Sequence, residues 1–166
     1  FSGYTDIAIG VALLLGFRLP DNFNAPYTAV SLTDFWGRWH MTLSRWLRDY
    51  VFFPMARRFA VGASSRAGNR QRLGTYGCLF LTMLLAGLWH GAGWTFVVWG
   101  AIHGTGLACE RAYRDARRLR GLPAPRPTAA RTAVHRIVTF NVVCFAWIFF
   151  RADSLATAQA IITGLF

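Results

Sequence analysis

Apolar residues gather in long runs along the chain, and turn-forming or basic segments separate them. The runs cover residues 4–17, 73–91, 94–109, 137–151 and 154–166. Residues 73–90 have about the minimum length for a membrane-spanning helix. We therefore expect an all-α integral membrane protein, a multi-span helical bundle in one partial membrane domain. Because the first run resembles the later part of a span, we expect that the sequence starts inside a longer protein.

Residues 32–50 alternate between apolar and polar positions with the period of a helix, unlike the continuous apolar runs. Apolar and aromatic side chains recur there every three or four residues, and arginines take the opposite side. Ser31 and Asp34 are typical of a helix start, because a hydroxyl caps free amides and a carboxylate suits the positive end of the dipole. The pattern predicts one amphipathic interfacial helix, which Pro54 is expected to close. Its apolar face contains Phe35, Trp36, Trp39, Leu43, Trp46, Leu47 and Tyr50.

The composition supports the membrane class, and the placement of the arginines accounts for the net positive charge. Hydrophobic residues make up 54% of the chain and charged residues 15%, and the net charge is +11. The arginines gather in residues 57–72 and 111–136, which predicts two cytoplasmic loops and argues against nucleic acid as a partner. Residues 73–109 would then form a hairpin that turns at residues 91–93. Three isolated cysteines give no signal for a disulfide or a zinc site.

Histidine supplies the candidate chemistry. His90 lies among glycines and tryptophan in residues 87–93, where two apolar runs meet, and His40 follows Trp39 at the edge of the amphipathic helix. An imidazole can exchange a proton near neutral pH, so both are candidate catalytic residues, with His90 as the general base and His40 orienting the acceptor or assisting. Packing is the expected role of His103, although it could support another histidine, and His135 is expected at the surface. The chain lacks the motifs of a metal site, a serine nucleophile or an ATP-binding loop.

Glycine spacing predicts close helix packing. Gly87 and Gly91, and again Gly100 and Gly104, are four residues apart, as in helices that approach closely in lipid. The glycines beside His90 would also let backbone amides approach an oxyanion. Trp89 and Trp94 are expected to wall the cavity around His90. Asn141 is expected to make a bond between packed helices.

Four segments carry a resemblance to a known family. Residues 1–12, 34–50, 81–103 and 139–153 resemble the membrane-bound O-acyltransferase (MBOAT) family, and within it the bacterial branch that acetylates alginate and other exported polysaccharides. The resemblance covers nearly the whole chain except the two basic segments. Gly37 departs from the pattern, since a bulkier and often basic residue is expected there, and glycine would loosen the interfacial helix.

The resemblance implies a function. His90 matches the essential histidine of the family and His40 the second histidine of its bacterial branch. The implied protein is multi-pass and longer than this chain, which would be its C-terminal part. It lies among lipid in the bacterial inner membrane and moves an acetyl group toward the hydroxyls of an exported polysaccharide. Acetyl-CoA is the implied donor substrate, and no cofactor is bound permanently. A separate periplasmic acetyltransferase is the implied partner for the final transfer to sugar.

Alternatives remain open at this stage. The related bacterial branch transfers D-alanine to teichoic acids, and a non-catalytic membrane scaffold or transport component could use the same histidines for packing or proton relay. The basic segments could be topology signals alone or could hold the phosphates of coenzyme A.

Overall fold

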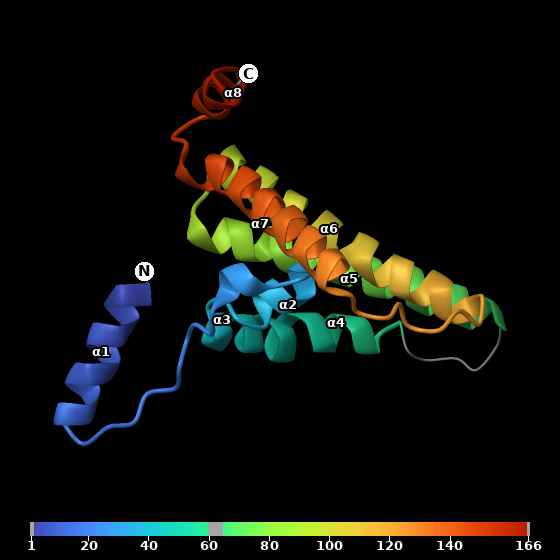
Figure 1. The fold of residues 1–166 in the computed structure, drawn as a ribbon, viewed down its shortest axis with the longest axis horizontal. Coiled ribbons are helices and arrows are strands. Elements are labelled where there is room, and N and C mark those ends of the chain that lie inside the picture. The colour runs from blue at the N-terminus through green and yellow to red at the C-terminus, as the bar shows by residue number, and fades with distance from the viewer. Residues whose placement is uncertain (1, 60–64, 166) are drawn as a thin grey trace.

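The structure is a computed structural model that describes residues 2–59 and 65–165, and this part of the chain is helical and contains no strand (Figure 1). This agrees with the predicted all-α class. The α-helices are α1 (Ser2–Leu14), α2 (Leu32–Trp36), α3 (Met41–Trp46), α4 (Phe53–Arg57), α5 (Ser65–His90), α6 (Trp94–Leu119), α7 (Ala129–Arg151) and α8 (Leu155–Thr163). A 3-10 turn covers Pro26–Thr28, and a π-helix, η2, covers Leu47–Phe52.

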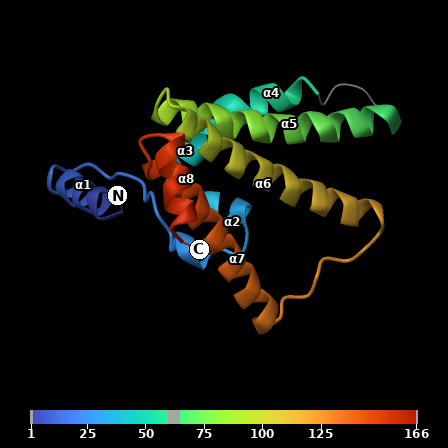
Figure 2. The same ribbon diagram turned by 90° about the horizontal axis from the view of Figure 1, so that it is seen from above.

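Helices α5 and α6 form an antiparallel hairpin that turns where the sequence predicts, between His90 and Trp94 (Figures 1 and 2). Glycines allow their backbones to touch. A Cβ on Gly100 would lie 2.5 Å from the Met83 carbonyl oxygen, and a Cβ on Gly104 would lie 2.9 Å from Phe80 Cα. The predicted close approach at these positions is confirmed, because no larger residue fits without moving the partner helix.

The core lies where α2, α3, α5, α6 and α7 meet. Helix α7 packs along α6, and the short helix α2 also contacts α6. The buried residues of this core are Ala29, Leu32, Phe35, Leu47, Met83, Ala86, Trp99, Leu107, Val143 and Ala146. Helix α1 stands apart from these helices and buries none of its residues (Figures 1 and 2).

The amphipathic segment is not the single helix 32–50 that its periodicity predicts. The predicted start is correct, since Ser31 Oγ accepts a hydrogen bond from the Asp34 amide at 3.0 Å. Helix α2 then ends at Gly37, and His40 takes a left-handed conformation with φ 43° before α3 begins. The chain continues as a helix through Pro54, which occupies the first turn of α4. The π-helix η2 runs directly into α4, with the Phe53 amide donating to the Arg48 carbonyl, so Pro54 lies within a continuous helical segment and does not end it.

The connector between α1 and α2, residues 15–31, causes the break. Its backbone bonds the segment that follows α2, with the Asn24 amide donating to the Arg38 carbonyl and the Met41 amide donating to the Asn22 carbonyl, each at 2.9 Å. These bonds replace helical ones, so the backbone can leave the helix without losing partners. Hydrophobic periodicity reports only which face is buried and therefore misses this break.

Both basic segments are more helical than predicted. Helix α5 already begins at Ser65, within the predicted loop 57–72, and residues 60–64 lie outside the described residues. Helix α6 runs on to Leu119 and α7 begins at Ala129, so only residues 120–128 of the predicted loop 111–136 are non-helical. Arginine and alanine favour helix, and the prolines confine the loop to the stretch that contains them.

Two of the described helices are long and apolar enough to cross a membrane, residues 68–90 of α5 and residues 129–151 of α7. The expected span 94–109 lies within α6, and the expected first span corresponds to α1, a shorter apolar helix. Asn141 does not bond a neighbouring helix as predicted, because its Nδ2 donates to the Ile137 carbonyl of its own helix at 2.8 Å.

Candidate functional site

His40 and His90 line the same cavity, which has a volume of about 490 Å³. It lies between the hairpin turn, α3 and the C-terminal end of α7. Its remaining walls are almost entirely aromatic, formed by Trp36, Trp39, Leu43, Trp89, Trp99, Trp147 and Phe150. The fold therefore brings together two histidines that are 50 positions apart in the sequence.

Helix α5 presents His90 as its last residue. The imidazole is half-buried and packs edge-on against Phe150 and Trp99, with ring centroids 4.9 and 5.5 Å away. No hydrogen bond to the His90 ring is found within residues 2–59 and 65–165. Aromatic packing thus fixes the orientation of the ring and leaves both of its nitrogens available to a bound molecule.

Asn22 orients His40. The buried Asn22 Oδ1 lies 3.2 Å from His40 Nδ1 and also accepts from the Thr42 amide at 3.1 Å and from Thr42 Oγ1 at 3.0 Å. Because an amide oxygen can only accept, His40 Nδ1 must carry the proton, and Nε2 is the basic nitrogen. Burial lowers the pKa of His40 below its ordinary value, which keeps the ring neutral at neutral pH.

This arrangement suits proton transfer between two bound molecules. A neutral imidazole can take a proton from a hydroxyl and return it to a leaving group. The aromatic walls make the cavity less polar than water, and a less polar surrounding strengthens the polar contacts made inside it. The cysteines are free thiols, and the described residues contain no group of three side chains suited to hold a metal.

The other histidines lie outside this cavity. His103 is completely buried in α6, where Trp36 Nε1 donates a hydrogen bond to its Nδ1 at 3.3 Å. His135 is exposed on α7, as predicted. Of the two tryptophans expected in the wall, Trp89 lines the cavity, whereas Trp94 is 73% exposed and does not.

Sequence reasoning missed the residues that complete the site from distant segments. Asn22 lies in the segment between the first apolar run and Ser31, and Trp147 and Phe150 lie in the apolar run 137–151. No local signal connects them to the histidines, because it is the docking of the connector and of α7 that places them there. Nothing short of the tertiary fold identifies them.

The glycines next to His90 are explained by packing. A Cβ on Gly87 would meet the Phe96 carbonyl oxygen, and a Cβ on Gly91 would lie 2.5 Å from the Phe96 ring. The first turn of α6 therefore occupies the space beside both glycines. Neither glycine needs a role in binding an oxyanion.

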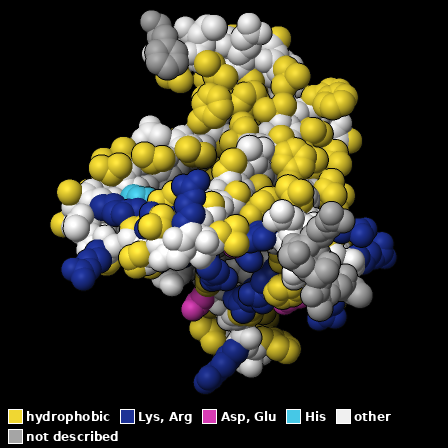
Figure 3. All heavy atoms as spheres, turned by 90° about the vertical axis from the view of Figure 1, so that its right-hand side faces the viewer, with side chains coloured by type: hydrophobic (Ala, Val, Ile, Leu, Met, Phe, Trp, Pro, Cys, Tyr) yellow, Lys and Arg dark blue, Asp and Glu magenta, His cyan; other side chains and the backbone are white. Residues whose placement is uncertain are grey.

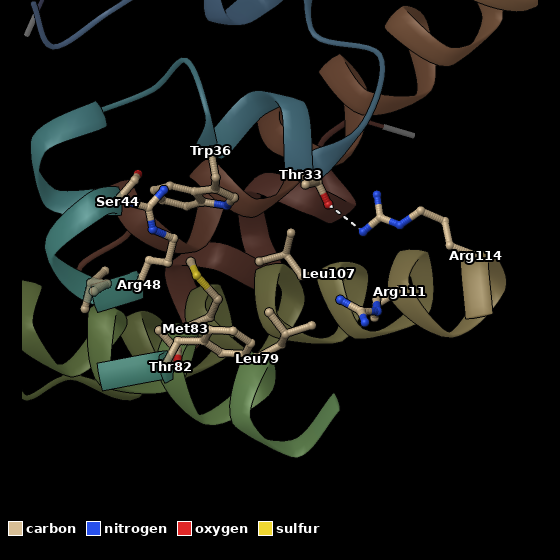
Figure 4. A pocket seen from close by; sticks show the side chains of 12 residues that line it. Thr33, Trp36, Ser44, Arg48, Leu79, Thr82, Met83, Leu107, Arg111 and Arg114 are labelled. Carbon is tan, nitrogen blue, oxygen red and sulfur yellow. Dashed lines mark hydrogen bonds between the residues drawn. The ribbon is translucent and has the colours of Figure 1, made fainter. Parts of the chain in front are cut away.

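A second pocket, of about 260 Å³, lies on the other side of Trp36 (Figure 4). Its floor is apolar, with Leu79, Met83 and Leu107, and the side chains of Arg48, Arg111 and Arg114 stand around it. Arg114 Nη2 donates to Thr33 Oγ1 at 3.3 Å. Trp36 lines both this arginine-rimmed pocket and the histidine cavity, so its indole forms a wall shared by the two.

Comparison with known proteins gives consistent results. Residues 1–159 match the membrane-bound O-acyltransferase family. The chain is 46% identical to the probable alginate O-acetylase of Azotobacter vinelandii and 43% identical to the peptidoglycan O-acetyltransferase of Helicobacter pylori, over 100% and 99% of its length. It is 35% identical to the teichoic acid D-alanyltransferase of Bacillus subtilis over 90% of its length.

The chain covers only part of these relatives, 30%, 28% and 37% of their respective lengths. The matched region nevertheless contains both candidate histidines and every described helix from α1 to α7, together with the start of α8. The family resemblance read from the sequence motifs is confirmed. The chain belongs to the membrane-bound O-acyltransferase family.

Proposed function

We propose that the protein containing this chain is a membrane O-acyltransferase that moves an acetyl group from a cytoplasmic thioester donor, acetyl-CoA, toward the hydroxyls of an exported polysaccharide. The observation that carries the proposal is the shared cavity, in which an aromatic wall surrounds His40 and His90. The names of the relatives from Azotobacter vinelandii and Helicobacter pylori support the acetyl group and the polysaccharide acceptor.

In the proposed reaction His90 is the general base. It takes the proton from the acceptor hydroxyl while that oxygen attacks the thioester carbonyl carbon and forms the new C–O bond. The tetrahedral intermediate then collapses, the C–S bond breaks, and His90 returns the proton to the departing sulfur. Such proton transfer contributes typically about 10² to 10⁴ in rate.

His40 is proposed to orient the acceptor. With Nδ1–H bound to Asn22, its Nε2 can accept a hydrogen bond from a substrate hydroxyl. That bond would direct the hydroxyl oxygen toward the carbonyl carbon, and correct orientation of reacting groups is itself a large part of catalysis.

Partner and location are also proposed. The family is membrane-bound, and we place the whole protein in the bacterial inner membrane as a multi-pass protein. A periplasmic acetyltransferase would complete the transfer to sugar. The arginines of residues 111–136 would face the cytoplasm, where excess positive charge is retained. The arginine-rimmed pocket, which includes Arg111 and Arg114, would face the same side.

The test is the ester content of the exported polysaccharide in cells whose full-length protein carries His90→Ala. We expect base-labile acetate to disappear while the protein stays in the membrane at normal abundance. His135→Ala is the matched control, because His135 is exposed on α7 and away from the cavity. Acetylation that persists in His90→Ala would contradict catalysis and favour a scaffold or transport component.

Transfer of D-alanine to teichoic acids is a second candidate, favoured by the 35% identity to the Bacillus subtilis enzyme. The same cells distinguish the two reactions. Loss of D-alanyl ester from the envelope, with polysaccharide acetate unchanged, would support the second candidate over the first.

A further inference from the structure

His103 is a polar residue at a position that otherwise suits an apolar one. It is 0% exposed, and the rings of Phe35, Trp36 and Trp99 surround it, with centroids 6.3, 5.2 and 4.9 Å away. The only hydrogen bond to its ring within the described residues comes from Trp36. Since Nδ1 accepts this bond, the neutral ring carries its proton on Nε2.

That proton has no partner. His103 Nε2 is buried and makes no hydrogen bond to residues 2–59 or 65–165. A buried donor without an acceptor is costly, so an apolar side chain of similar size would fill this space more favourably. Packing alone therefore does not account for histidine here, whereas its bond to the Trp36 indole does.

Trp36 is the residue through which His103 can influence the site. The indole belongs to both the histidine cavity and the arginine-rimmed pocket. Edge contacts to Phe35 and Trp99, with centroids 5.6 and 5.8 Å away, constrain the plane of the indole. Sliding or rotation of the indole within that plane is opposed by the hydrogen bond, because a bond to a fixed imidazole nitrogen has one favourable direction.

We propose that His103 is a positioning residue for the acyl transfer: it holds Trp36 as the wall between the arginine-rimmed pocket and the histidine cavity. This inference rests on the proposed function. His103 does not touch the reacting atoms. It fixes the shape of the cavity in which the thioester carbonyl must meet His90 and the acceptor hydroxyl.

The test compares two substitutions in the full-length protein. His103→Asn keeps an acceptor near the place of Nδ1, whereas His103→Leu fills the space without one. We expect kcat for transfer from acetyl-CoA to fall about 10-fold to 100-fold in His103→Leu, as for other misplacements of about 1 Å. His103→Asn should recover most of this loss. His103→Leu and Trp36→Phe should not be additive in the double variant, because both break one bond.

A spectroscopic measurement tests the bond without depending on activity. Ultraviolet resonance Raman difference spectra, wild type minus Trp36→Phe, isolate the Trp36 indole and report whether its N–H is hydrogen-bonded. We expect the bonded signature in the wild type and in His103→Asn, and its loss in His103→Leu.

Each result decides a separate point. An unchanged indole signal in His103→Leu would overturn the proposal, and so would an altered signal with unchanged kcat. Equal losses of kcat in both His103 variants, or fully additive effects with Trp36→Phe, would also overturn it. If the wild-type protein transfers no acyl group, the proposed function fails and the catalytic role of His103 fails with it, while the Raman comparison still tests the bond.

Discussion

At the scale of single residues, the tautomer of His40 is fixed by three hydrogen bonds that meet on Asn22 Oδ1. The same environment determines how the site responds to pH. Burial lowers the pKa of His40 from its ordinary value of 6.5, so the neutral ring is favoured in the folded state. The unfolded chain binds this proton more readily, and the stability that His40 contributes is present above pH 6.5 and is lost as the pH falls.

The pH dependence of activity should follow. We expect activity to fall on the acid side with a midpoint below 6.5, because protonation removes the acceptor at Nε2. Asn22→Asp places a carboxylate against the imidazole, which favours the charged ring and raises its pKa. The acid midpoint of kcat/KM, measured from pH 5 to 8, should therefore move upward in Asn22→Asp. A midpoint that stays in place would contradict the role given to His40.

The sequence singled out the two candidate histidines that line the cavity but not the residues that surround and orient them. His40 and His90 stand out because histidine is rare in apolar and aromatic surroundings and has an obvious chemistry. Asn22 and Trp147 have no such signature, since asparagine is common in turns and tryptophan is common in membrane proteins. Their roles arise from contacts between segments that are far apart in sequence.

At the scale of elements, backbone contact at glycines sets the distance between α5 and α6. Gly100→Ala should destabilise the full-length protein by about 1–3 kcal/mol, because the new methyl group would lie 2.5 Å from the Met83 carbonyl oxygen. Gly77→Ala is the control on α5, where no atom lies within 4 Å of the added carbon. It should be neutral or gain up to about 1 kcal/mol from helix propensity. Thermal unfolding in detergent measures both, and equal melting temperatures would contradict the packing account.

Helix α2 is too short to be stable alone, and Glu110 of α6 holds its first turn. The carboxylate accepts hydrogen bonds from the Leu32 and Thr33 amides and from Thr33 Oγ1, at the positive end of the helix. Glu110→Ala should cost about 1–3 kcal/mol in unfolding free energy and lower activity, because Trp36 is carried on α2. Glu110→Gln keeps one acceptor oxygen and should lose less. If Glu110→Ala and Glu110→Gln lower the unfolding free energy equally, the hydrogen bonds to the Glu110 carboxylate are not what stabilises α2.

Periodicity and turn residues predicted the elements better than their ends. The hairpin turn at residues 91–93 and the start at Ser31 follow from local chemistry, and both are found. The break after Trp36 depends on hydrogen bonds to the distant connector, and Gly37 was its only local sign. The basic segments were assigned to loops by charge, although arginine is a good helix former and its side chain stays solvated on a helix end.

At the scale of the whole molecule, the arginine-rich N-terminal turns of α5 and C-terminal turns of α6 lie at the end of the bundle away from the hairpin turn, and α7 begins apart from both (Figures 1 and 2). On the face seen from the arginine-rich end, basic side chains gather below a broad hydrophobic surface (Figure 3). If the protein lies in the inner membrane as proposed, the positive-inside rule predicts that this basic end faces the cytoplasm.

The orientation can be measured by labelling in a cysteine-free full-length protein. Arg118→Cys and Trp94→Cys place single thiols at opposite ends of α6, both at exposed positions. We expect a membrane-impermeant maleimide to reach position 118 from the cytoplasmic side only and position 94 from the opposite side only. Labelling of both positions from one side would contradict the predicted topology.

The most direct test of the central claim is acyl transfer by the purified full-length protein with His90→Asn. Release of the thiol from acetyl-CoA and appearance of acetyl ester on the acceptor are measured together. Loss of the general base predicts a fall in kcat of about 10² to 10⁴, with His135→Asn equal to the wild type. A His90→Asn protein that folds normally and transfers acetyl at the wild-type rate would contradict catalysis by His90.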